Sequence, residues 1–170
     1  RGHIESLSEE ERTNLFEQIG LGGLKYYLLK VDPKKRMMFN PEESIDLTGN
    51  TGPFIQYAHA RISTLLERGG TIDTAEIQQA SLIHEEKEII KLLTQFPHAI
   101  HEAASSYSPA IIANYIYDLV KHYNQFYQAV KILSEENAAN KNLRLAMSEC
   151  VRRSIQHSLL MLGIQAPVKM

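Results

Sequence analysis

The sequence is poor in cysteine, has no excess of one charge and contains no long apolar run. Cys150 is the only cysteine in 170 residues, which excludes a disulfide framework and a thiolate metal site and favours an intracellular origin. No run approaches the roughly 18 apolar residues of a membrane span. We therefore expect a cytoplasmic protein without a membrane partner. The chain begins with Arg1 and has no signal-peptide pattern, so we interpret it as a piece of a longer protein.

The formal net charge of -2 argues against nucleic-acid binding by bulk electrostatic attraction alone. The basic residues are nevertheless concentrated toward the C-terminus. From Ala138 onward the only acidic residue is Glu149, whereas the basic residues there are Lys141, Arg144, Arg152, Arg153 and Lys169. A local basic patch is therefore compatible with the composition.

Catalytic and metal-binding signatures are also missing. The segment "GLGG" at 20–23 has neither the spacing nor the preceding strand of a phosphate-binding loop, and there is no nucleophile elbow. His98 and His101 are three residues apart and are followed by Glu102, but the sequence places no third histidine or thiolate ligand beside them. We expect no metal site, and catalysis through these three residues is the least favoured hypothesis.

Residues typical of helix starts and ends predict an all-α helical bundle preceded by a partly irregular linker segment. Proline at position 53 and the glycine pair at 69–70 bound the clearest predicted helix, 53–68. The other predicted helices are 8–19 ending at Gly20, 24–31, one or two within 77–96, a short helix from Pro97 to 105, a long helix opening at Ser108-Pro109, and 143–162. A single turn is expected at Asn40-Pro41. We assign 1–52 to the linker and 53–170 to the helical domain.

The stretch "NTGPFIQYAHAR" at 50–61 crowds aromatic residues and an arginine into a helix start. On a helical wheel, Ile55 and Ala58 fall on the buried stripe, whereas Tyr57 and Arg61 fall just outside it, beside Phe54. Such a cluster is most often core. The alternative is a rim where an unpaired nucleotide base stacks on Tyr57 while Arg61 reaches an anion.

Tyr127 on the long predicted helix has a similar position at the edge of the apolar face. Asn124 and Lys131 lie one turn away on either side. A tyrosine at such an edge usually packs its ring and exposes its hydroxyl group to water. It is also a second candidate platform for a stacked base.

Longer segments resemble one family specifically. The stretch "GLKYYLLKVDPKKRMMFNPEESIDLTGNTGPFIQYAHARI" at 23–62 is similar to the junction between the catalytic and anticodon-binding domains of class I arginyl-tRNA synthetases. The stretch "LVKHYNQFYQAVKIL" at 119–133 and the tail "GIQAPVKM" follow the order of that family. The resemblance implies the C-terminal anticodon-binding portion of an arginine–tRNA ligase, with arginine tRNA and the catalytic domain of the same polypeptide as partners.

The resemblance also implies roles for particular residues. The aromatic pair of the family falls on Phe54 and Tyr57, its later tyrosine on Tyr127 and its terminal methionine on Met170, and Arg61 joins them from the rim. Candidate phosphate contacts near the C-terminal helix are Lys131, Lys141, Arg144, Arg152 and Arg153.

The parent enzyme is expected to use ATP and magnesium. The H-I-G-H and K-M-S-K signatures of the family do not occur in this sequence. We therefore expect the chain alone to be inactive and to hold no cofactor. The rival hypothesis is a helical protein-interaction module that uses the same aromatic edge and does not bind tRNA.

Overall fold

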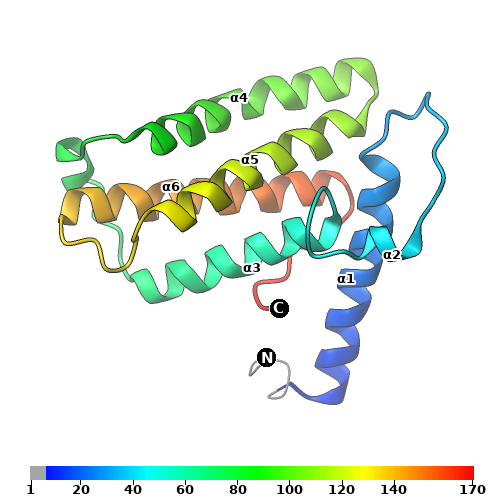
Figure 1. Ribbon diagram of the computed structural model, residues 1–170, viewed down its shortest axis with the longest axis horizontal. Helices are drawn as coiled ribbons and strands as arrows, with labels where there is room; N and C mark the ends of the chain where they lie inside the picture. Colours follow the sequence, from blue (N-terminus) through cyan, green and yellow to red (C-terminus); the bar gives the residue numbers. More distant parts are fainter. Residues whose placement is uncertain (1–6) are drawn as a thin grey trace.

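The computed structural model describes residues 7–170, so residues 1–6 of the predicted linker segment lie outside the described residues. Figure 1 shows an arrangement of helices without any strand in this part of the chain, which confirms the predicted all-α class. The helices in chain order are α1 (Glu9–Leu29), α2 (Pro41–Ser44), α3 (Gly52–Gly69), the 3-10 helix η2 (Glu76–Gln79), α4 (His84–Ser106), α5 (Pro109–Ala129) and α6 (Ala138–Met161). No helix within residues 7–170 is both long and apolar enough to cross a membrane.

The four long helices α3 to α6 run alongside one another, and α1 crosses one end of this bundle (Figure 1). A single hydrophobic core joins them, and Ile62 of α3, Ile116 of α5 and Ile155 of α6 are fully buried in it. Tyr26 of α1 belongs to the same core. The division of the chain into 1–52 and 53–170 stays a prediction.

The predicted break at Gly20 is wrong, because α1 is one continuous helix that joins the predicted segments 8–19 and 24–31. Glycine in a helix interior costs about 1 kcal/mol relative to alanine. Here packing offsets that cost, because Gly22 and Gly23 lie where α1 meets other elements. A Cβ atom on Gly23 would lie 2.7 Å from the carbonyl oxygen of Ser44 in α2.

The helix predicted to begin at Pro97 is also wrong, because α4 continues through that residue. Proline removes one helical hydrogen bond and usually kinks a helix. The exposed Pro97 is tolerated where packing holds the helix: the neighbouring Phe96 ring stacks on Tyr115 of α5, with centroids 5.4 Å apart.

Helix starts mostly follow side-chain caps. The helices predicted from Pro53 and Pro109 and the turn at Asn40-Pro41 are confirmed. The span 77–96 divides into η2 and the first half of α4, where the carboxylate of Glu86 accepts a hydrogen bond from the N–H of Ile83. The last helix begins five residues before the predicted Leu143, because the Asn137 side chain caps it by accepting from the N–H of Asn140.

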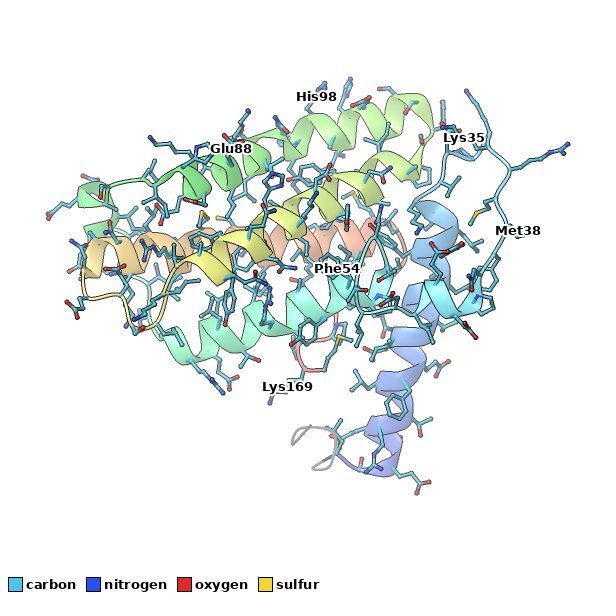
Figure 2. All side chains as sticks on the ribbon, viewed as in Figure 1. Lys35, Met38, Phe54, Glu88, His98 and Lys169 are labelled. Carbon is cyan, nitrogen blue, oxygen red and sulfur yellow. The ribbon has the colours of Figure 1, made fainter. Side chains whose placement is uncertain are left out.

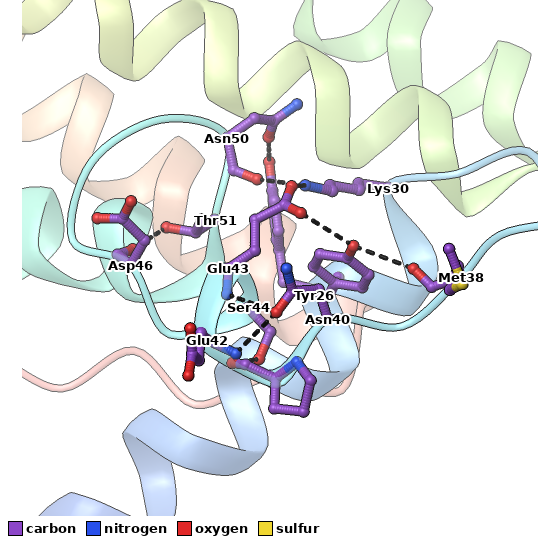
Figure 3. A network of polar contacts seen from close by, with 12 residues as sticks. Tyr26, Lys30, Met38, Asn40, Glu42, Glu43, Ser44, Asp46, Asn50 and Thr51 are labelled. Carbon is purple, nitrogen blue, oxygen red and sulfur yellow. Dashed lines mark hydrogen bonds and ion pairs between the residues drawn. The ribbon is translucent and has the colours of Figure 1, made fainter.

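The loop before α3 is fixed between α1 and α5 (Figure 3). The buried Tyr26 hydroxyl lies 2.6 Å from Oδ1 of Asn50 and 2.7 Å from the carbonyl oxygen of Ala113. The Lys30 ammonium donates to the carbonyl of Asn50 at 2.9 Å. Directly after this loop, a Cβ atom on Gly52 would lie 2.5 Å from the carbonyl oxygen of Gly22. The crossing of α1 over the start of α3 therefore requires glycine at position 52.

We predict that Gly52→Ala destabilises the fold by about 1–3 kcal/mol, because the added methyl group meets backbone rather than a flexible side chain. The free energy of unfolding, measured in urea, checks this. Gly20→Ala is the matched control, since no atom lies within 4 Å of its Cβ position and alanine favours the helix by roughly 0.5–1 kcal/mol. Equal stability of the two variants would contradict the close crossing.

Candidate functional site

A groove of about 270 Å³ lies between α3, the C-terminal end of α5 and the last residues of the chain. We call it the α3 groove. Its aromatic and charged lining residues, together with the last residue of the chain, are Tyr57, Arg61, Arg68, Tyr127, Lys169 and Met170. In Figure 2, Lys169 lies beside α3, on the side of the molecule opposite His98 of α4. The structure thus brings together four of the predicted site residues, Tyr57, Arg61, Tyr127 and Met170.

The Arg61 guanidinium occupies the centre of an aromatic pair. Its central carbon lies 4.5 Å from the Tyr127 ring centroid and 5.9 Å from the Tyr57 ring centroid. Its Nη2 donates a hydrogen bond to Oδ1 of Asn124 in α5. Cation–π attraction and this bond hold a planar charged group between two tyrosines. Tyr57 remains 46% exposed, so its side chain is accessible to a ligand.

Phe54 does not line the α3 groove. It is partly buried against the core, and its ring packs on Tyr117 of α5 with centroids 5.9 Å apart. The predicted grouping of Phe54 with Tyr57 and Arg61 on one rim is corrected in this respect, because a helix turn separates Phe54 from the groove and α5 covers it.

The tail reaches the groove because α3 holds its carbonyl groups. Nε2 of Gln56 donates to the carbonyl of Gln165 at 2.9 Å, and Nδ1 of His59 lies 2.9 Å from the carbonyl oxygen of Pro167. A carbonyl only accepts, so Nδ1 of His59 carries the proton. Both side chains are fully buried.

The tail turns toward α3 at Gly163, which has a φ of 67°. The N–H of Ile164 then donates to the carbonyl of Leu159 at 2.8 Å, which closes the end of α6. From this turn the chain passes along α3 and ends with Met170 in the groove.

Comparison with known proteins assigns the chain to a family. Residues 55–170 match the DALR anticodon binding domain. The chain belongs to this family. It is 53% identical over 169 residues to an arginine–tRNA ligase of Flavobacterium psychrophilum, covering 99% of this chain and 28% of that protein. It is 45% identical to an arginine–tRNA ligase of Bacteroides thetaiotaomicron, with 99% and 29% covered.

Solved structures agree with this assignment. The Thermus thermophilus arginyl-tRNA synthetase matches with a TM-score of 0.88 and 29% identity, over 100% of this chain and 29% of that one. An arginyl-tRNA synthetase from Plasmodium falciparum shares the fold, with a TM-score of 0.79 at 23% identity over 92% of this chain and 28% of that one. The chain thus spans less than a third of the length of these relatives.

The basic side chains of this DALR domain differ in how accessible they are to a phosphate group. The predicted phosphate contact at Arg144 is wrong. Arg144 is buried, its Nε donates to Glu86 at 2.8 Å, and its Nη1 donates to Glu135. A buried arginine that neutralises two carboxylates cannot leave them without a large penalty. No local sequence pattern indicates that carboxylates from α4 and the α5–α6 loop converge there.

The other predicted phosphate contacts lie outside the groove. Arg152 and Arg153 both donate to Glu149, at 2.8 and 2.7 Å. Lys131 is exposed and Lys141 is half-buried. Their contacts with phosphate stay predictions. Sequence reasoning missed Arg68, although its spacing of seven residues from Arg61 places both on one helix face.

The histidines that prompted the metal hypothesis are exposed on α4, and Figure 2 shows His98 on the outer side of this helix. Nε2 of His98 is 3.9 Å from a carboxylate oxygen of Glu102, and His101 is exposed. Among residues 7–170, no three histidine, cysteine or acidic side chains are grouped closely enough to hold a metal ion.

We predict that acid weakens the tail's attachment through His59. Burial, with a smaller contribution from Arg152, lowers the pKa of His59 below its ordinary 6.5, although the bond to Pro167 and the charge of Glu149 oppose the shift. The unfolded chain therefore takes up a proton near pH 6.5 that the native state resists. The free energy of unfolding should fall as the pH drops below this value.

The measurement compares unfolding free energies between about pH 7.5 and pH 5.5. His59→Asn, whose amide replaces the Nδ1 donor, should lose less stability with acid than the wild type. His101→Gln on the surface should keep the wild-type dependence. If the unfolding free energies of the wild type and of His59→Asn depend on pH in the same way, His59 is not the titrating group.

Proposed function

We propose that the chain is the tRNA-recognising portion of an arginine–tRNA ligase, and that the α3 groove receives unpaired bases from the anticodon loop of arginine tRNA. One observation carries this proposal. In a member of the DALR anticodon binding domain family, an arginine is fixed between two tyrosines along a groove whose far wall ends in Met170.

The chemistry of the groove suits a single-stranded loop. Unpaired bases expose their flat faces, and a base stacked on an aromatic side chain gains about 1–3 kcal/mol. The exposed Tyr57 ring offers such a face, and the Arg61 guanidinium beside it offers charge and donors toward base edges. Stacking then supplies affinity, and hydrogen bonds to the base edges supply discrimination.

The relatives named arginine–tRNA ligase are more than three times as long as this chain. In our proposal the remainder of the protein supplies the catalytic domain, with ATP and magnesium, and attaches arginine to the tRNA in the cytoplasm. The chain's contribution is recognition, and alone it does not charge tRNA. Its anticodon contacts hold the tRNA so that the parent enzyme acts on the correct one.

We predict that the chain binds an anticodon stem-loop of arginine tRNA more tightly than the same stem-loop with an exchanged anticodon. Tyr57→Ala should weaken binding of the cognate stem-loop by roughly 5- to 150-fold, which corresponds to one lost stacking contact. Tyr57→Phe keeps the ring and should bind almost as the wild type does. Fluorescence anisotropy with labelled stem-loops measures all three proteins.

Tyr107→Ala is the control for an exposed tyrosine outside the groove, since Tyr107 is 87% exposed at the end of α4. Equal affinities for the two anticodons would contradict the specific claim. Failure of the wild type to bind either stem-loop would favour the protein-interaction module.

A further inference from the structure

The charged side chains that line the α3 groove are all cations. Its side chains include the cations Arg61, Arg68 and Lys169 and no aspartate or glutamate. This differs from the chain as a whole, whose formal net charge is -2. A positive groove in a slightly acidic protein indicates an anionic ligand.

The three cations are not equivalent. Arg61 is held in place by its two tyrosines and by Asn124, and its Nε is buried without a hydrogen-bond partner. It is therefore a fixed part of the stacking platform. Arg68 and Lys169 are both exposed. Among the hydrogen bonds and ion pairs of residues 7–170, none involves the side chain of either.

Arg68 and Lys169 come from the two walls of the groove. Tyr57, Arg61, Thr64 and Arg68 follow one another at spacings of four, three and four residues, so they form one stripe along α3. At a rise of 1.5 Å per residue, this stripe extends roughly 16 Å from Tyr57 to Arg68. Lys169 faces it from the tail, which Gln56 and His59 hold in place.

We infer that Arg68 and Lys169 bind backbone phosphates of the RNA strand whose bases stack beside Tyr57, and that they direct the strand along α3 toward its C-terminal end. This inference rests on the proposed function. It replaces the buried Arg144 with two available cations, and it assigns phosphate binding to the groove rather than to the surface of α6.

The test is the salt dependence of stem-loop binding. Each phosphate neutralised on a single strand contributes about 0.7 to the slope of log affinity against log salt concentration. Arg68→Gln and Lys169→Gln should each lower that slope by about 0.7 and weaken cognate and exchanged anticodons by the same factor, because phosphates carry no sequence information.

Two variants with the same change in charge serve as controls. Lys87→Gln removes an exposed lysine from α4, and Arg36→Gln removes an exposed arginine from the loop between α1 and α2. Both should keep the wild-type slope. Unfolding midpoints equal to that of the wild type establish that each substituted chain is folded.

The outcomes separate the two proposals. If the wild type discriminates between anticodons but the groove variants keep its salt slope, the phosphate inference is wrong and the proposed function stands. If Arg153→Gln lowers the salt slope and the groove variants do not, the phosphate contacts lie on α6, where Arg153 is exposed. Absence of any RNA binding by the wild type would overturn both proposals.

Discussion

The hydrogen bonds from Gln56 and His59 to the carbonyls of Gln165 and Pro167 determine where the chain ends on its own surface. A hydrogen bond contributes about 1 kcal/mol net, but a buried donor left without its partner costs about 1–3 kcal/mol. The buried side chains of α3 therefore strongly favour the tail in this path. Without it, the α3 groove would lose Lys169 and Met170, and only α3 with Tyr127 and Leu133 would remain to line it.

Three faces of α3 have different roles. Ile55, Ala58 and Ile62 enter the core, Gln56 and His59 hold the tail, and Tyr57, Arg61 and Arg68 line the groove. The glycine contact between α1 and Gly52 fixes the start of the same helix. Packing of α3 in the bundle therefore also fixes the position of the groove side chains that it carries. These side chains lose little conformational entropy when a ligand binds.

Local signals predicted the elements that they control, and they failed where distant parts of the chain decide. Proline and cap residues correctly marked the starts of α3 and α5, whereas Gly20 and Pro97 suggested breaks at which α1 and α4 in fact continue. The contacts of Gly22 and Gly23 with α3 and α2, and of Phe96 with Tyr115 of α5, hold these helices in place. Periodicity separated Tyr57 and Arg61 from the core, but it could not show that Tyr117 covers Phe54 or that two carboxylates enclose Arg144. Met170 came from the family resemblance, since no periodic pattern relates a chain end to a helix.

The most direct measurement locates the RNA on the surface. An NMR titration of the chain, labelled at methionine methyl groups and backbone amides, with an arginine tRNA anticodon stem-loop reports each contact region separately. If the RNA binds in the α3 groove, we expect large shift changes for the Met170 methyl group and for the amides of Tyr57, Arg61 and Tyr127, with little change at His98 and His101 on α4. Changes confined to α1 or α4, with the Met170 signal unmoved, would contradict it.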